Sequence, residues 1–397
     1  MIKRTLQELC LNITDGKHGD CENEENSGYY FISCKDIFDG QINYKNARQI
    51  TKADFEETHK RTMLEVDDIL LTNSGTIGRM AFVTDREATT KTTFQKSVAI
   101  IKPDKQKVLP RYLYYQLQNC VPQFINSSNG SAQKNLLLST MRTFQIEIEE
   151  NREKQEKIAN TLSAYDDLIE NNQKQIKLLE EAAQRLYKEW FVDLRFPGHE
   201  NTKIVDGVPE GWSKSTVGNI CKLRKVVITP DKIESNTPYI GLEHMPRNDI
   251  CLSTWGKSEE INSNKFIYLK KDVLFGKIRP YFHKVGFALN DGITSTDTMV
   301  MVADQNLWGL LLVTVSSDTF VDFSYQNCKE GAKMPRADWK QMEKYAIMIA
   351  DQATQKLFEQ EILVITNKIS ALAFQCRSLR EARDRMLPKL MGGEVEV

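Results

Sequence analysis

The chain lacks the features that mark a membrane or secreted protein. None of its apolar runs reaches the roughly 18 residues that a membrane-spanning helix needs. The N-terminal stretch MIKRTLQELCLNI has no apolar core of about 7–15 residues, as a signal peptide would. The eight cysteines are all at least 11 residues apart, which excludes C-x-x-C and zinc-finger spacings. We therefore expect a cytoplasmic protein without membrane contacts, whose thiols are reduced and partly buried.

Motifs for catalysis are also missing. The sequence contains no N/D-P-P-Y/F/W motif for adenine methylation, and G-T-I-G at 75–78 lacks the lysine of a phosphate-binding loop. Asp67 and Asp68 have no D/E-x-K partner downstream, so a turn at the start of a strand explains them better than a nuclease site does. The five histidines show no metal-binding spacing. We expect no catalytic centre, metal site or cofactor in this chain.

Charge gives no hint of a nucleic-acid partner. The 53 basic and 54 acidic side chains leave a formal net charge of −1. A DNA-binding face would require charges that are separated in space, which a count cannot reveal.

A long helix without glycine or proline is predicted near the middle of the chain, over 158–191. Its apolar positions alternate in steps of four and three, as in the seam of a coiled coil. At 1.5 Å per residue this helix would be roughly 50 Å long. The seam comprises Ile158, Leu162, Tyr165, Ile169, Asn172, Ile176, Leu179, Ala183, Leu186 and Trp190.

The same register returns 200 residues later, where Pro388 is expected to end or kink the helix. We interpret the two helices as partners, with Asn172 fixing their register. Two independent amphipathic helices, each packed on its own domain, are the alternative. The second seam comprises Phe358, Ile362, Ile365, Ile369, Leu372, Cys376, Leu379, Arg383, Met386 and Leu390.

The repeat extends over the whole chain. The segment at 67–82 is similar to that at 271–287, and G-S-A-Q-K-N at 130–135 is similar to G-A-K-M-P-R at 331–336. Between the helices the sequence has short strand-like runs, such as 69–71, 81–83, 98–101, 273–275 and 298–302. We therefore predict an α+β fold: two pseudo-two-fold-related mixed α/β domains (1–150 and 197–350) separated by two long antiparallel helices that form a coiled coil (151–196 and 351–397). Residues 197–212 are predicted to link the halves.

In this order the repeated segments resemble the specificity subunits of type I restriction–modification enzymes. The resemblance covers essentially the whole chain. Its clearest motifs are E-K-Q-E-K-I-A-N-T-L-S-A-Y-D-D-L-I-E-N-N (153–172), L-L-E-E-A-A-Q-R-L-Y-K-E-W-F (178–191), V-P-E-G-W (208–212), G-S-A-Q-K-N-L (130–136) and L-P-K-L-M-G-G-E (387–394).

The resemblance implies a non-catalytic DNA-reading subunit. Two target recognition domains would each read one half of a split site on double-stranded DNA. The helices would set the gap, at most about 15 base pairs for a rod of this length, and dock two methyltransferase subunits. A restriction subunit joins in a full system but not in a modification-only one. S-adenosylmethionine, ATP and Mg²⁺ are then expected on the partner subunits.

Base reading needs loops rich in hydrogen-bond donors and acceptors. In the first domain we expect DNA contacts from Asn73, Ser74, Gly75, Thr76 and Arg79, from Ser131, Gln133, Lys134 and Asn135, and from Lys17 and His18. In the second domain we expect them from Lys277, Arg279, Tyr281, Lys333 and Arg336. The alternative for the first two loops is a turn without a ligand.

Apolar residues off the seam are candidates for docking the methyltransferase subunits, although any one of them can equally cover the edge of the helix pair. They are Leu168, Leu178, Ala182, Tyr187, Phe191, Leu357 and Leu387. Two rival functions remain at this point: a coiled-coil adaptor that binds only proteins, and an enzyme that cuts or methylates by itself.

Overall fold

The computed structural model describes residues 1–45, 47–84, 87–128, 135–259, 261–304, 306–328 and 334–395. The chain divides into two compact units, and each is described by itself. Unit 1 comprises Met1–Asp167 and Arg380–Val397, and unit 2 comprises Leu168–Leu379. Each unit contains one predicted recognition domain together with part of both long helices. The units therefore divide the chain inside the helices, not at the predicted domain boundaries.

Unit 1 is built on a four-stranded antiparallel sheet with the order β2-β10-β7-β8. Its strands are β2 (Cys10–Asp15), β10 (Val98–Pro103), β7 (Ile69–Thr72) and β8 (Met80–Phe82). A second sheet has the order β6-β3-β9, in which β3 and β9 are parallel, and two pairs of short strands complete the unit. These strands are β6 (Arg48–Gln49), β3 (Tyr30–Ile32), β9 (Thr92–Phe94), β1 (Ile2–Thr5) with β11 (Gln145–Ile148), and β4 (Ile37–Phe38) with β5 (Gln41–Ile42).

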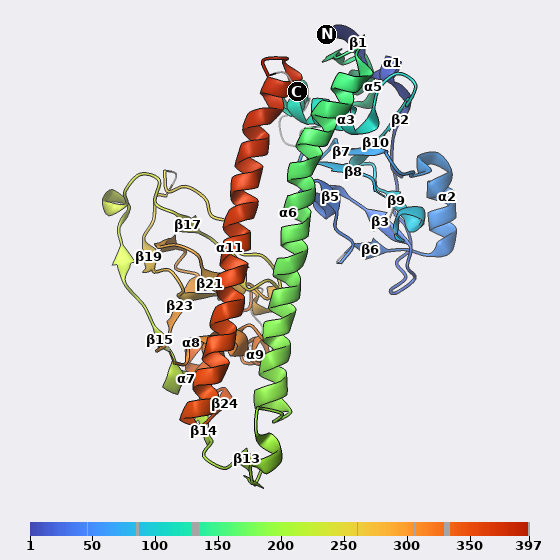
Figure 1. Ribbon diagram of the computed structural model, residues 1–397. Helices are drawn as coiled ribbons and strands as arrows, with labels where there is room; N and C mark the ends of the chain where they lie inside the picture. The colour runs from blue at the N-terminus through green and yellow to red at the C-terminus, as the bar shows by residue number, and fades with distance from the viewer. Residues whose placement is uncertain are drawn as a thin grey trace. The chain divides into compact units, whose positions relative to one another are not determined.

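Five helices cover these sheets, and α2 packs against β9 (Figure 1). They are α1 (Leu6–Leu9), α2 (Lys52–Thr62), α3 (Pro110–Asn119), α4 (Val121–Asn126) and α5 (Leu138–Thr143). The central strand β7 is buried on both faces, because Ile69 and Leu71 join one apolar cluster and Leu70 joins another. This is the alternation that the two-residue period of a strand dictates.

Unit 2 repeats this plan. Its main sheet has the order β15-β23-β20-β21-β18, and its second sheet has the order β16-β19-β22-β17, with β17 parallel to β22. The main-sheet strands are β15 (Lys222–Leu223), β23 (Thr298–Val302), β20 (Val273–Gly276), β21 (Val285–Ala288) and β18 (Cys251–Leu252). The others are β16 (Val227–Ile228), β19 (Lys265–Tyr268), β22 (Gly292–Thr294), β17 (Tyr239–Ile240) and β14 (Ser213–Thr216) with β24 (Ala346–Ile349).

The four helices of unit 2 follow the order of α1, α3, α4 and α5 in unit 1. They are α7 (Val217–Ile220), α8 (Trp308–Val315), α9 (Asp318–Gln326) and α10 (Trp339–Met342). In β20 the residues alternate as in β7, with Val273 and Phe275 in one apolar cluster and Leu274 in another. The predicted linker 197–212 contains a short hairpin of β12 (Ile204–Val205) and β13 (Val208–Pro209).

The repeat that the sequence predicts is visible down to single side chains. Asp68 and Asp272 each start an equivalent strand, and each follows a residue with a left-handed backbone. The Asp68 carboxylate accepts hydrogen bonds from Glu65 N and Lys102 Nζ, and that of Asp272 from Leu269 N and Arg224. The interpretation of Asp67 and Asp68 as a strand-start turn is confirmed.

The two long helices are α6 (Arg152–Tyr187), extended by a π-helical turn at Lys188–Val192, and α11 (Gln352–Met391). They pair within each unit. In unit 2, Cys376 Sγ contacts the carbonyl of Ile169, while the ring of Trp190 packs against Phe358. Residue numbers rise along α6 as they fall along α11, so the helices are antiparallel.

The predicted seam positions are buried or half-buried in both helices. Asn172 is the buried polar exception, and its amide donates to Gln375 Oε1 at 3.2 Å. A buried amide with a single specific partner favours one register over others.

The expectation that Pro388 ends the second helix was wrong. The helix α11 continues to Met391, and Leu390 and Met391 are buried in the core of unit 1. Among the apolar residues off the seam, Phe191 packs against Phe358 and Trp212. Tyr187 and Leu387 are half-buried against the cores of their units, so these residues cover the edge of the helix pair. The π-helical turn shifts the helical phase here, so that Phe191 points inward as well as Trp190.

In the described part of the chain, no helix is both long enough and apolar enough to span a bilayer.

Candidate nucleic-acid interface

Three segments of the second predicted recognition domain meet at one end of its main sheet. The backbone N–H of Lys277 donates to Asp297 O at 2.8 Å, and that of Arg279 donates to Pro335 O at 2.8 Å. Ile278 and Arg336 form an antiparallel bridge. We call these segments, 277–283, 295–297 and 334–337, loop cluster 2. Two of them were predicted to bind DNA, and the structure brings these two together.

The side chains of loop cluster 2 are rich in charge. Arg336 Nη1 lies 3.0 Å from Asp297 Oδ1. The ammonium of Lys277 donates to the Thr296 carbonyl at 2.7 Å and lies 5.6 Å from the Phe266 ring centroid. Burial lowers the pKa of Lys277. Lys277 and Arg336 thus lie close to one carboxylate, that of Asp297.

Arg279 occupies an unusual place. Its φ of 50° is left-handed, and its Nε is buried with no hydrogen-bond partner among the residues that the structure describes. Its guanidinium lies 5.7 Å from the Phe282 ring centroid, and Arg247 lies over the same ring at 3.9 Å. The exposed ring of Tyr281 packs edge-on against Phe282 and Tyr325. The exposed Arg247 and Tyr281 side chains are of the kinds that bind phosphates and stack on bases.

The first domain has an equivalent arrangement, loop cluster 1, formed by residues 73–79, 95–97 and 135–136. Asn73 N donates to Ser97 O at 3.1 Å, and Leu136 N donates to Asn73 O at 2.8 Å. Ser74 and Asn135 form an antiparallel bridge. The side chains of Thr76 and Arg79 are exposed at the tip of the β7–β8 hairpin.

The matching bonds pair the two clusters residue by residue. Asn73 corresponds to Lys277, Ser97 to Asp297, and Asn135 to Arg336. Gly75 corresponds to Arg279, and both have a left-handed backbone. An added Cβ at Gly75 would also make a tight contact with Cys34 Sγ, at 3.1 Å. At these three matched positions the first cluster has neutral amides and a hydroxyl, and the second cluster has charged side chains.

Lys17 and His18 lie beside loop cluster 1 but are already paired. Lys17 O accepts a hydrogen bond from Lys96 N at 3.1 Å. The ammonium of Lys17 lies 3.0 Å from Asp54 and 3.2 Å from Glu57, and the hydrogen bond to Asp54 raises the pKa of Lys17. His18 Nε2 lies 2.9 Å from Asp15 Oδ2. A DNA phosphate would have to displace these carboxylates, so this pair is the weakest of the predicted contacts.

Four predicted contacts, Ser131, Gln133, Lys134 and Lys333, lie outside the described residues. Sequence reasoning missed four residues near the clusters: Ser97, Asp297, Arg247 and Tyr325. The 200-residue offset of the repeat relates Ser97 to Asp297 and was a usable signal for that pair. Nothing in the sequence singles out Arg247 or Tyr325.

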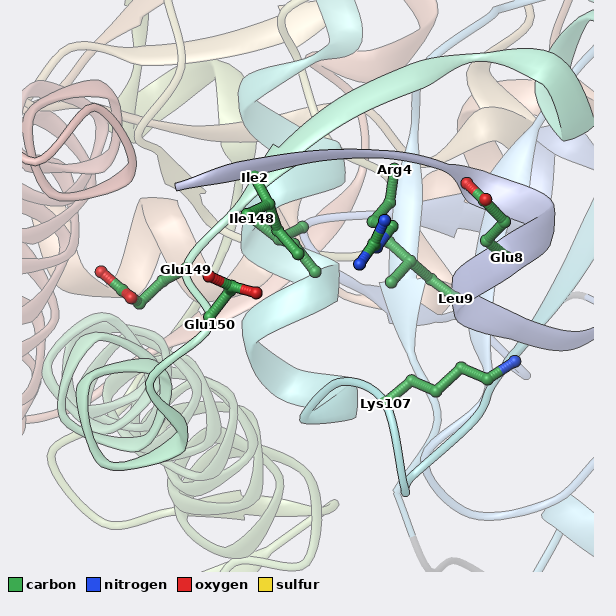
Figure 2. A pocket seen from close by; sticks show the side chains of 8 residues that line it. All are labelled: Ile2, Arg4, Glu8, Leu9, Lys107, Ile148, Glu149 and Glu150. Atoms are coloured by element: carbon green, nitrogen blue, oxygen red, sulfur yellow. The ribbon is translucent and has the colours of Figure 1, made fainter.

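A hollow of about 450 Å³ lies in unit 1. Figure 2 shows the side chains that line it. It lies along β1 and β11, and its charged side chains include both signs. Glu8 and Thr5 form the capping box of α1, and the hydrogen bonds from Thr5 lower the pKa of Glu8. This mixture does not favour a phosphate. The lining residues are Ile2, Arg4, Glu8, Leu9, Lys107, Ile148, Glu149 and Glu150.

Among the described residues, no three His, Cys, Asp or Glu side chains lie close enough together to bind a metal ion.

Comparison with known proteins gives a consistent result. Residues 3–181 match the family model described as the type I restriction modification DNA specificity domain. The chain is 25% identical over 401 residues to the type I restriction enzyme MjaIX specificity subunit of Methanocaldococcus jannaschii, covering 92% of this chain and 87% of that protein. It is 28% identical over 173 residues to the EcoBI specificity subunit of Escherichia coli, covering 43% of this chain and 35% of that protein.

A solved structure shares the fold. The S subunit of a type I restriction–modification system from M. genitalium superposes with a TM-score of 0.57 at 16% identity, covering 98% of this chain and 95% of that one.

Proposed function

Because this chain belongs to the family of type I restriction–modification specificity subunits, we propose that it reads a two-part sequence on double-stranded DNA. Each recognition domain reads one half-site, through loop cluster 1 or loop cluster 2. The chain supplies sequence recognition and no catalysis. S-adenosylmethionine, ATP and Mg²⁺ belong to its partner subunits in this proposal.

The observation that carries the proposal is the repetition of one loop arrangement in two domains. Both clusters join the same three segments through the same backbone bonds, yet the side chains that they present differ. Bases are distinguished by the hydrogen-bond donors and acceptors on their edges. Two domains with the same backbone arrangement but different side chains can therefore recognise two different half-sites.

The paired helices set the gap between the half-sites in this proposal. The 36 residues of α6 alone correspond to about 54 Å of helix axis. Two methyltransferase subunits dock on the outer faces of the helices, and a restriction subunit joins in a full system. Support comes from the exposed apolar side chains Leu168, Leu178, Leu357, Val364 and Phe374, which a helix otherwise places inward.

The test is a genome-wide map of modified bases in cells that carry this chain with its methyltransferase subunit. We expect a two-part motif with a fixed gap, which disappears when the gene for this chain is deleted. A continuous motif, or a map that the deletion leaves unchanged, would contradict the proposal and favour the adaptor that binds only proteins.

A further inference from the structure

We propose that Asp297 is a positioning residue for Arg336, and that the pair makes the second recognition domain require a G·C base pair at one position of its half-site. The inference rests on the proposed function, since it assigns a specificity to loop cluster 2.

A carboxylate in this place needs an explanation. Asp297 forms an ion pair with Arg336 and lies near Lys277, in a cluster that would face the DNA. Its own backbone is fixed, because its N–H donates to Ser295 Oγ at 3.1 Å and its carbonyl accepts from Lys277 N at 2.8 Å. The side chain is about one-third exposed, so it is not a core residue. DNA phosphates repel a surface carboxylate, and its presence weakens binding unless it has a specific partner.

Arg336 is that partner, and the geometry leaves it free to read a base. The recorded contact joins Asp297 Oδ1 to one terminal nitrogen of Arg336, at 3.0 Å. A guanidinium has five N–H donors, so the remaining nitrogens can reach O6 and N7 of a guanine. More than half of the Arg336 side chain is exposed, while its backbone is bridged to Ile278.

The ion pair therefore gives Arg336 a fixed direction at the surface. A free arginine side chain has many rotamers, and ordering it on DNA costs conformational entropy. A carboxylate that holds the guanidinium in advance reduces this cost, but only for the base that the held orientation suits.

The first domain provides an internal comparison. Ser97 takes the place of Asp297 there, and its hydroxyl accepts a hydrogen bond from Cys34 N at 3.1 Å. Asn135 takes the place of Arg336. The substitution Asp297→Ser thus transfers the equivalent residue of the first domain into the second. Asp297→Asn is the matched variant that keeps the side-chain shape and removes only the charge.

The experiment uses the full chain in complex with its methyltransferase subunit. Modified bases are mapped for the wild type, Asp297→Ser, Asp297→Asn and Arg336→Ala, with Ser97→Ala as the control in the first domain. We expect one G·C position in one half of the wild-type motif to become degenerate in all three variants of the second domain. In binding to duplexes that differ at that position, discrimination should fall by about tenfold. Ser97→Ala should leave that half of the motif unchanged.

The Asp297→Ser/Arg336→Ala double variant should discriminate no worse than Arg336→Ala alone, because Asp297 acts through Arg336. An unchanged motif in Asp297→Ser would overturn the inference, as would a second half-site without any G·C pair. Equal loss of both half-sites in Asp297→Ser and Asp297→Asn would also overturn it, since that marks a purely structural role. In each of these cases the wild type still yields a two-part motif, whereas its absence would mean that the proposed function itself is wrong.

Discussion

Arg383 of α11 lies 2.5 Å from Asp166 of α6, measured from Nη1 to Oδ1, and the two side chains are each about one-fifth exposed. The hydroxyl of Tyr115 donates to the other carboxylate oxygen of Asp166 at 2.6 Å. Arg383 is the one charged residue at a seam position of α11. Its ion pair with Asp166 explains how a charge is accommodated there. The pair links both helices to α3 inside unit 1.

Arg383→Ala should lower the free energy of unfolding by about 2 kcal/mol, because it leaves a half-buried carboxylate without its cation. Arg385→Ala is the control, since Arg385 is far more exposed and its ion pair with Glu381 is 3.9 Å long. Urea unfolding of both variants measures the difference. Equal destabilisation by the two substitutions would contradict a specific role for the pair.

Glu180 on α6 makes stability depend on pH. Its side chain is buried, and its Oε1 accepts hydrogen bonds from the backbone of Ile250 and Cys251 at 2.9 and 3.2 Å. Burial raises the pKa of Glu180 to about 7, and the nearby Asp249 carboxylate acts in the same direction against Lys177. Between pH 4.5 and about 7 the folded chain therefore binds a proton that the unfolded chain has released.

The Glu180 contribution to stability consequently falls as the pH rises through this window, by about 3 kcal/mol in total. Glu180→Gln keeps an oxygen acceptor for both backbone N–H groups and removes the titration. We expect this variant to be more stable than the wild type at pH 8 and nearly equal to it at pH 4.5, as measured by urea unfolding at a series of pH values. Parallel pH profiles for the two proteins would contradict the assignment.

Gly16 joins β2 to the second sheet of unit 1 at a point with no room for a side chain. A Cβ there would lie 1.9 Å from Phe94 O, the atom that accepts the hydrogen bond from Lys17 N. Gly16→Ala should therefore destabilise the chain by about 3 kcal/mol. At Gly19 the nearest atom to an added Cβ is Lys17 Cε at 3.9 Å, so Gly19→Ala should be close to neutral. Thermal unfolding that shows equal midpoints for the two variants would rule out the close contact.

Leu357 and Val364 are seven residues apart on α11, and both are exposed. If a methyltransferase subunit covers them, Leu357→Glu/Val364→Glu should reduce its co-purification with this chain at least tenfold, because burying two carboxylates is costly. Gln360→Glu adds one carboxylate to the same face without removing apolar surface and should have a clearly smaller effect. The unfolding temperature of the free chain should change in neither variant. Full retention of the partner by the double variant would place the docking site elsewhere.

The structure is predicted best from the sequence where a periodic apolar pattern continues over many residues. Phe358 and Ile362 lie in the seam as their spacing predicts, and the buried strands β7 and β20 were located from short apolar runs. Which residues off the seam turn inward could not be predicted: Phe191 is buried because a π-helical turn changes the phase of the helix, and no residue pattern announces such a turn. The Asp297–Arg336 pair was out of reach for another reason: the two residues are far apart in sequence, and only the fold brings them together.

Arg279 offers the sharpest comparison between the two recognition domains. Its position in loop cluster 2 is equivalent to Gly75 of loop cluster 1, so the first domain has no side chain to match it. If Arg279 reads a guanine, Arg279→Ala should relax the motif at one base pair in one half-site and lower the discrimination there by about 1–3 kcal/mol. Arg79→Ala, at the tip of the corresponding hairpin, is the control, and any effect on the motif should fall in the other half-site.

The salt dependence of binding separates this role from a contact to the DNA backbone. A phosphate contact has no sequence preference, so Arg279→Ala would then weaken binding to all duplexes equally and reduce the slope of log K against log salt concentration by about one. For a base contact the slope should change less than the discrimination between duplexes. Measuring both quantities for the same variant decides between the two roles, because the left-handed backbone and Phe282 hold the guanidinium in one place for either of them.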